Sequence, residues 1–148
     1  MNDVTSPLRA NYDELVRRVI VDKQKIGYFS QEVIEMLDLD LYVGMPIYIG
    51  LSNVEHIKKR HPYEYEKYFT HIEDIISTPD YVGRNPSDGS IAFVKFYNIG
   101  DEYVRVAVKI TTKGVAFVKT LHLLSTVNAE RYIKKGTLKP LTIVSDKV

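Results

Sequence analysis

Residues 103–110, Tyr-Val-Arg-Val-Ala-Val-Lys-Ile, decide the fold class, because apolar residues occupy every second position there. The three valines and the isoleucine form one face, and the tyrosine, arginine, alanine and lysine between them form the other. A period of two is that of a β-strand with one buried and one open face. The stretch therefore predicts a long strand whose open face carries Arg105 and Lys109.

Two further strands flank this one. Ile91–Asn98 precedes it and ends at the turn Gly100-Asp101, and Val115–Leu123 follows it after the turn Lys113-Gly114. Consecutive strands joined by tight turns predict an antiparallel meander, to which Tyr81–Gly83 adds a short strand. Helical patterns occupy most of the chain before it. We therefore predict an α+β fold, with helices first and an antiparallel meander after them.

The clearest helix signals lie before the meander. Ser30 can cap a short helix, and Ser52–Glu55 has the pattern of a capping box at the start of another. That second helix should end near His61, because Pro62 disfavours helical geometry in the residue before it. A further helix is predicted to follow and to end at Pro79.

The size and composition limit the class of protein. The chain has 148 residues, of which 45% are apolar and 26% charged, so we expect one folded domain over residues 16–148 behind a flexible arm over residues 1–15. The absence of cysteine excludes disulfide scaffolds, thiolate zinc sites, cysteine nucleophiles and zinc deaminases. With no long apolar run and no signal-peptide pattern, we expect a cytoplasmic protein without membrane contact.

Charge is unevenly distributed along the chain, although the formal net charge is only +1. Residues 105–139 carry eight bases against one acid, or +7, whereas residues 1–104 carry 11 bases and 17 acids, or −6. This asymmetry favours an anionic partner for the C-terminal part, and the alternative is a solvated face of lysines. The residues predicted to bind such a partner are Arg105, Lys109, Lys119, Lys134 and Lys135.

The residues that could carry chemistry are histidines and strand lysines. His56 and His61 lie five apart, which separates them by about 140° on a helix, whereas a zinc-binding pair lies four apart. We therefore predict no metal and no cofactor. The structural alternative is a hydrogen-bonded core histidine beside a helix-end cation. Lys95 and the pair Lys119-Thr120 interrupt otherwise apolar strands, which places each lysine at a rim or on an open sheet face.

Such a set fits cleavage of an RNA phosphodiester without a metal. One group takes the proton of the ribose hydroxyl, another protonates the leaving oxygen, and a cation stabilises the charge of the transition state. Histidine exchanges protons near neutral pH. Glu64 and Glu66 are further candidates for the base, but their pattern is more typical of solvent-facing helix residues. His122 could face either side of its strand.

Short motifs occur in a fixed order over roughly residues 20–140. They are Lys25-Ile26-Gly27-Tyr28-Phe29-Ser30, His56-Ile57…Arg60-His61-Pro62, Ile76…Pro79-Asp80-Tyr81, Ser90-Ile91…Val94-Lys95, Lys119-Thr120-Leu121 and Lys135-Gly136-x-Leu138. With its motifs in this order, the chain resembles the phage-type members of the barnase–EndoU–colicin–RelE group of nucleases. These are the PBECR-like domains of phages and toxin cassettes.

The resemblance implies N-terminal helices packed on a four-stranded antiparallel β-meander like that of barnase. It also implies a metal-independent ribonuclease site on the exposed face of the sheet. By position, His56 and His61 correspond to the histidines of the helix motif, and Lys95 to the basic residue of the first meander strand. Thr120 corresponds to the hydroxyl residue of the last strand, and Arg131 is matched by its place in the basic C-terminal segment. These five are the predicted catalytic residues. The catalytic glutamate of barnase has no counterpart, so the general base is not assigned.

The expected function is a metal-independent endoribonuclease, a toxin or phage effector acting on RNA such as tRNA in a bacterial cytoplasm. A cognate antitoxin or immunity protein is the expected protein partner. One alternative is a catalytically inactive domain that binds RNA or protein in a phage or toxin–antitoxin system, which the eleven tyrosines favour. Another is a metal-dependent hydrolase using His56, His61 and a carboxylate, which the histidine spacing disfavours.

Overall fold

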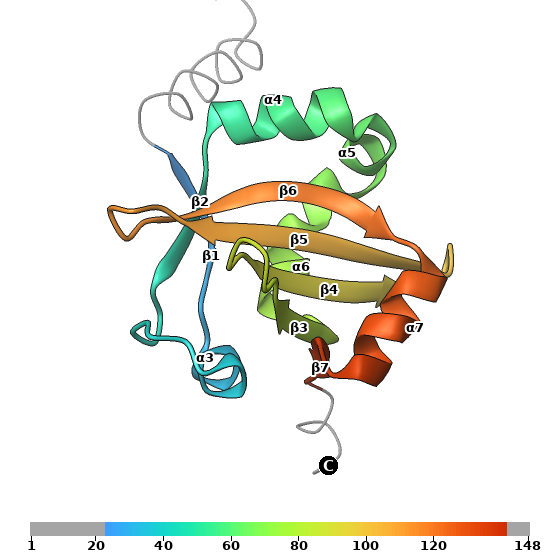
Figure 1. Cartoon of the computed structure of the whole chain (residues 1–148). Helices are drawn as coiled ribbons and strands as arrows, with labels where there is room; N and C mark the ends of the chain where they lie inside the picture. Colours follow the sequence, from blue (N-terminus) through green and yellow to red (C-terminus); the bar gives the residue numbers. More distant parts are fainter. Residues whose placement is uncertain (1–22, 142–148) are drawn as a thin grey trace, which may run out of the picture.

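The computed structural model describes residues 23–141, so the predicted arm over residues 1–15 lies outside the described part. In this part no helix is long and apolar enough to cross a membrane. Figure 1 shows the elements in chain order: β1 (Gln24–Tyr28), α3 (Gln31–Leu37), β2 (Pro46–Ile49), α4 (Leu51–Arg60), α5 (Pro62–Tyr68), the 3-10 helix η1 (Phe69–His71), α6 (Ile72–Ser77), β3 (Tyr81–Arg84), β4 (Ile91–Tyr97), β5 (Glu102–Ile110), β6 (Ala116–Leu124), α7 (Thr126–Lys135) and β7 (Leu138–Pro140).

The strands form a single sheet in the order β1-β2-β6-β5-β4-β3-β7. Strands β3 to β6 pair antiparallel in chain order, β1 pairs antiparallel with β2, and β2 pairs parallel with β6. The α+β class is confirmed. The sheet, however, has seven strands rather than the predicted four and is mixed rather than antiparallel. The additional strands are short, and three-residue β7 contains a proline, so pairing with neighbours rather than a local apolar pattern defines them.

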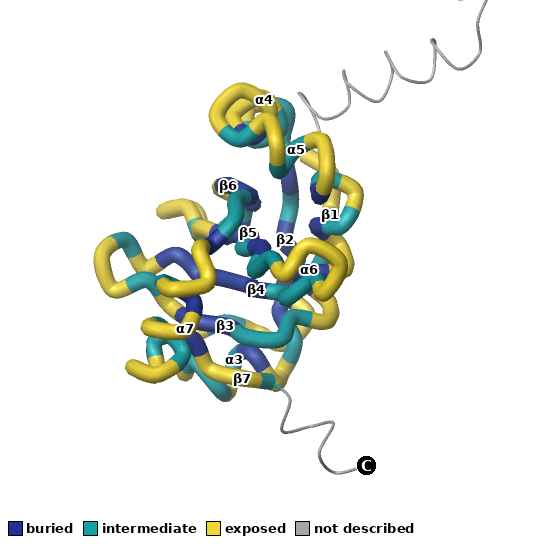
Figure 2. The backbone as a smooth tube through the Cα atoms, turned by 90° about the vertical axis from the view of Figure 1, so that its right-hand side faces the viewer, coloured by how far each residue is buried: buried dark blue, intermediate teal, exposed yellow. Residues whose placement is uncertain are grey.

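The two faces of the sheet are covered to different extents. The valines of β5 at positions 104, 106 and 108 are buried in the main core, together with the isoleucines of α6. The opposite face holds a smaller core, in which α7 packs through Ala129 against Leu124 and Val94. Figure 2 shows the buried segments concentrated in the central strands, whereas α4 is largely exposed. The alternation in residues 103–110 thus separates a covered face from a partly open one.

A β-bulge in β6 decides which of its side chains face the open side. Val108 pairs with Val118 and Ala107 pairs with Thr120, so Lys119 is an extra residue on β6. An extra residue reverses the alternation of the side chains beyond it. Val118 and Leu121 are accordingly both buried in the main core, and Thr120 and His122 lie on the face of Arg105.

Helix α4 begins two residues earlier than the capping box predicted. The side-chain oxygen of Asn53 accepts a hydrogen bond of 2.8 Å from the backbone N–H of Gly50, which makes Gly50 the cap and places Ser52 inside the first turn. The predicted end is confirmed, because α4 stops at Arg60 and Pro62 is the first residue of α5. His61 therefore occupies the junction between two helices that follow the edge of β6 (Figure 1).

Candidate active site

Three cavities meet at Lys119. The largest has a volume of about 820 Å³ and lies beside the start of α4; we name it the flanking cavity and describe it below. The other two, of about 410 and 140 Å³, share Lys119, Thr120 and His122. We name these two together the Lys119 groove. It is lined by His56, Arg60, His61, Asn85, Asp88, Ser90, Ala92, Arg105, Ala107, Lys119, Thr120 and His122.

Three histidines adjoin one another in the groove. The ring of His61 stacks on that of His122, with centroids 5.3 Å apart and an interplanar angle of 25°. The ring of His56 lies edge-on to His61 at 6.1 Å. The helix motif and the last long strand of the meander therefore meet through their imidazoles. His122, whose orientation the sequence left open, faces the groove because the bulge at Lys119 turns it there.

Arg105 fixes the protonation of His122. The two residues pair across β5 and β6, and Nη2 of Arg105 lies 2.6 Å from Nε2 of His122. Because a guanidinium only donates, Nε2 must accept, and the proton of the neutral ring is on Nδ1. Burial, followed by the charge of Arg105 and by His61, lowers the pKa of His122 to about 4. At neutral pH His122 is therefore an uncharged donor at Nδ1.

Three buried polar atoms in the groove have no hydrogen-bond partner: Nε of Arg105, Oγ1 of Thr120 and Nδ1 of His122. Each carries a hydrogen to donate, and a buried donor without an acceptor costs about 1–3 kcal/mol. In residues 23–141 no carboxylate pairs with Arg105 either. All three residues line the smallest cavity. The wall of this cavity therefore contains unused donor capacity beside a half-buried guanidinium that has no carboxylate partner among the described residues.

An ion pair closes one side of the groove. The Nζ of Lys119 lies 2.8 Å from Oδ2 of Asp88, which belongs to the turn between β3 and β4. Lys119, together with the backbone N–H of Ser90, holds the pKa of Asp88 well below its usual range. The backbone oxygen of Asp88 also accepts from Lys109 at 3.5 Å. The turn is thus tied to both β5 and β6 beside the unpartnered donors.

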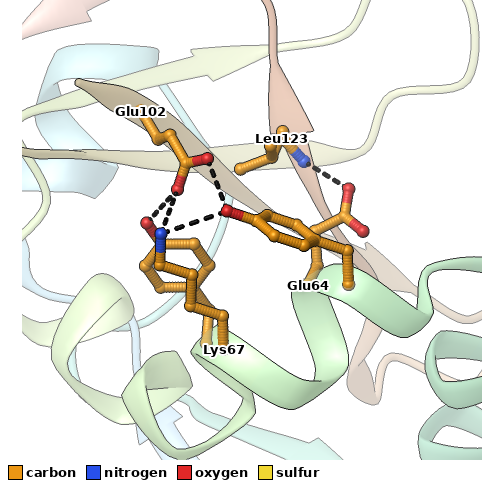
Figure 3. Close-up of polar contacts among 6 residues, drawn as sticks. Glu64, Lys67, Glu102 and Leu123 are labelled. Carbon is orange, nitrogen blue, oxygen red and sulfur yellow. Dashed lines mark hydrogen bonds and ion pairs between the residues drawn. The ribbon is translucent and has the colours of Figure 1, made fainter. Parts of the chain in front are cut away.

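Helix α5 is fixed to the sheet by the polar contacts in Figure 3. Oε2 of Glu64 accepts a hydrogen bond of 3.0 Å from the backbone N–H of Leu123, next to His122. Glu64 is therefore not the solvent-facing residue that its pattern favoured. Lys67 pairs with Glu102 at 3.1 Å, and the hydroxyl groups of Tyr63 and Tyr68 also donate to Glu102. These contacts hold His61, at the start of α5, against the sheet.

The same cluster shifts the pKa values of Tyr68, Glu102 and Lys67, and the contacts to Tyr63 and Glu102 raise that of Lys67. Burial, with the contact to Glu102, raises the pKa of Tyr68 to about 12, so its hydroxyl stays protonated and donates. The hydrogen bond from Tyr68, more than the ones from Tyr63 and Lys67, lowers the pKa of Glu102. The carboxylate therefore remains ionised at neutral pH, and the anchor of α5 persists.

The groove contains several of the residues predicted from the sequence. Of the predicted catalytic residues, His56, His61 and Thr120 line it. Arg105 and Lys119, predicted to bind the substrate, line it as well, and Lys109 lines the adjoining flanking cavity. His122 and the structural role of Glu64 were not predicted.

Lys95, a predicted catalytic residue, lies apart from the Lys119 groove. Lys95 follows Phe93 by two residues on β4 and so shares its face, the face of the main core. Its Nζ donates to the backbone oxygen of Thr78 at 2.6 Å and to the hydroxyl of Thr78 at 3.1 Å, at the end of α6. Thr120 lies on the opposite face. Lys95 is a structural cation rather than a member of the groove.

The basic residues of α7 also lie apart from the groove. Arg131 is exposed, donates to the side-chain oxygen of Asn128 at 2.8 Å and lies over the ring of Tyr132. Lys134 and Lys135 are exposed in the last turn of the helix. None of these three bases lines a cavity that meets Lys119, because α7 packs on the sheet through its other side, at Ala129. Their predicted catalytic and binding roles have no support in this geometry.

The lowered pKa of His122 predicts a pH-dependent stability. The unfolded histidine titrates near pH 6.5, so between pH 6.5 and 4 the unfolded state binds more protons than the folded state. We expect the free energy of unfolding to fall by about 2–3 kcal/mol across this window on account of His122. His122→Gln, which can still accept from Arg105, should lack this component. Urea unfolding of both proteins at pH 7 and pH 4 measures the difference, and equal losses would contradict the assignment.

In residues 23–141 no three histidine, aspartate or glutamate side chains are grouped so that they could hold a metal ion. The stacked histidines thus lack the accompanying carboxylate that the metal-dependent alternative requires. The positive charge observed in the groove comes from Arg60, Arg105 and Lys119.

Comparison with known protein families places the chain in a nuclease family. Residues 24–131 match the model of the family PBECR3, described as phage-Barnase-EndoU-ColicinE5/D-RelE like nuclease3. The matched region contains every residue that lines the Lys119 groove. No curated protein and no solved structure matches the chain significantly.

Proposed function

Because the chain belongs to the phage-Barnase-EndoU-ColicinE5/D-RelE like nuclease family PBECR3, we propose that it is an endoribonuclease that cleaves RNA in the Lys119 groove without a metal ion. The observation that carries the proposal is the set of three unpartnered donors on Arg105, Thr120 and His122, beside two further histidines. The donors fit the oxygens of a phosphodiester, and the histidines fit the two proton transfers that its cleavage needs.

The reaction proceeds in one displacement. One of the pair His56 and His61 removes the proton from the 2′-hydroxyl, and O2′ forms a bond to the adjacent phosphorus. The bond from phosphorus to O5′ breaks, and the other histidine gives its proton to that leaving oxygen. The products are a 2′,3′-cyclic phosphate and a 5′-hydroxyl, and the two histidines exchange protonation states. Ring centroids 6.1 Å apart leave both imidazoles within reach of one phosphate.

The remaining groove residues stabilise the transition state. Arg105 donates from Nε while its Nη2 holds His122, and His122 donates from Nδ1 without itself becoming charged. Thr120 supplies a hydroxyl donor. Preorganised donors of this kind act strongly where water is excluded, because they need no reorganisation as charge develops on the phosphate. Lys119 adds a positive charge when a phosphate of the substrate replaces Asp88 as its ion-pair partner.

Incubation of the purified protein with single-stranded RNA in EDTA tests the proposal. We expect cleavage to persist in the chelator, because the groove's own cations replace a metal, and we expect no cleavage of DNA of the same sequence, because DNA lacks the 2′-hydroxyl. Samples with added Mg²⁺ in place of EDTA serve as the control. Cleavage that occurs only with Mg²⁺, or equal cleavage of the DNA strand, would exclude the mechanism.

A further inference from the structure

The flanking cavity is not used by the reaction described above. Its volume of about 820 Å³ lies within the range of small-molecule sites, roughly 300–1,000 Å³. It shares His56 and Lys119 with the Lys119 groove, so the two form one continuous surface. The lining of the flanking cavity also includes Lys23, Lys109, Phe117 and Glu55. Three lysines against one carboxylate give it a net positive charge.

Lys109 and Phe117, which line the flanking cavity, belong to a row of side chains across three neighbouring strands. Lys109 of β5 is in register with Phe117 of β6, and Phe117 is in register with Tyr48 of β2. All three lie on the open face, because the residues on either side of each belong to the main core or pack against it. The rings of Tyr48 and Phe117 lie 6.3 Å apart at 49°. The Nζ of Lys23 lies 5.0 Å from the centroid of the Tyr48 ring.

This combination is that of a site for single-stranded nucleic acid. Successive bases stack on aromatic side chains, while lysines follow the phosphates. Phe117 lines the cavity, Lys109 is its cross-strand partner on β5, and Lys119 follows two residues further along β6. A base that stacks on protein cannot at the same time be stacked and paired in a duplex, so the geometry selects an unpaired strand.

We propose that the flanking cavity binds the nucleotide one position beyond the two that flank the scissile phosphate, with its base stacked on Phe117 and the phosphates on either side of it contacted by Lys109 and Lys23. This inference rests on the proposed function, since it extends the substrate from the Lys119 groove. It identifies the substrate class as single-stranded RNA of at least three nucleotides, and it identifies Phe117 as a residue that determines substrate length.

Binding of strands of increasing length tests the subsite independently of cleavage. The probes are fluorescein-labelled 2′-O-methyl oligouridylates of two, three and four residues, which cannot be cleaved because the 2′-oxygen is blocked, and the readout is fluorescence anisotropy in EDTA. For the wild type we expect about ten-fold tighter binding of the four-residue strand than of the two-residue strand, since one stacked base is worth that order of affinity.

Two substitutions at the same position separate stacking from packing. Phe117→Leu keeps apolar contact with Tyr48 and should lose most of the ten-fold gain, whereas Phe117→Tyr keeps an aromatic face and should retain it. Tyr42→Leu, at an exposed tyrosine in the loop before β2, is the matched control and should behave as the wild type. Thermal unfolding of each variant establishes that it is folded.

Equal affinity for the two-residue and four-residue strands overturns the subsite, and so does an undiminished gain in Phe117→Leu. RNA cleavage by the same preparations reports separately on the proposed function. If the wild type cleaves RNA but binds all strand lengths equally, the proposed endonuclease activity stands and the proposed subsite is wrong. If the wild type shows the Phe117-dependent gain in affinity but does not cleave RNA, the proposed subsite stands and the proposed endonuclease activity is wrong.

Discussion

The His61→Ala variant is expected to cleave RNA about 10²–10⁴-fold more slowly than the wild type in EDTA, the range lost when a general acid or base is removed. His56→Ala should show a loss within the same range. Each variant keeps the cations and donors of the groove, so the affinity for a non-cleavable strand should change little. Initial rates under saturating RNA measure the effect on turnover separately from binding.

The pH profile adds a readout that a purely structural role would not change. With both histidines present, the rate should pass through a maximum between a limb that reports the base and a limb that reports the acid. Each single substitution should remove one limb. His71→Ala, at a histidine that contacts Tyr68 and Tyr97 away from the groove, is the matched control and should cleave as the wild type. If both His56→Ala and His61→Ala retain wild-type rates, the proton-transfer assignment is wrong.

The Arg105→Met variant is expected to lose about 10²–10³ in cleavage rate, the effect of removing one preorganised donor from the transition state. The same substitution should change the free energy of unfolding little, because the hydrogen bond to His122 is lost together with the cost of burying the charge. A half-buried guanidinium without a carboxylate partner is costly, and a methionine of similar length removes that cost while filling the space. Loss of function without loss of stability is the pattern expected of a binding residue.

Kinetics and urea unfolding on one preparation of Arg105→Met measure both quantities. Arg105→Lys should restore little activity, because an ammonium group cannot hold His122 and the phosphate from separate nitrogens. Arg84→Ala removes an exposed arginine of β3 and serves as the control, with an unchanged rate expected. A destabilised Arg105→Met that still cleaves at the wild-type rate would make Arg105 a structural residue.

The parts of the fold predicted from sequence were those with strong local signals. The period of two in residues 103–110 gave β5 and its two faces, and Pro62 gave the break between α4 and α5. The same signals located His56, His61 and Arg105, because a strand face and a helix end limit where each side chain can lie. These predictions needed no knowledge of the tertiary pairing.

The faces of the sheet on which Lys95 and His122 lie could not be predicted from the local sequence. Residues 91–94 of β4 are buried on both faces, so no alternation tells which side Lys95 takes. His122 lies beyond the bulge at Lys119, and the side it faces depends on that one extra residue in the pairing of β5 with β6. The strands β1 and β7 likewise exist because partners are present, since neither has an alternating apolar pattern of its own.

The most direct measurement of the central claim is the chemistry of the cut ends. A DNA strand that contains a single ribonucleotide is incubated with the protein in EDTA, and the products are identified by mass spectrometry. The account predicts one cut, immediately 3′ of the ribose, leaving a 2′,3′-cyclic phosphate or its hydrolysed form on one fragment and a 5′-hydroxyl on the other. A 5′-phosphate on the cut end, or a cut between two deoxyribonucleotides, would contradict the account. So would a strand that stays intact in EDTA when the same preparation cleaves all-RNA strands only with Mg²⁺.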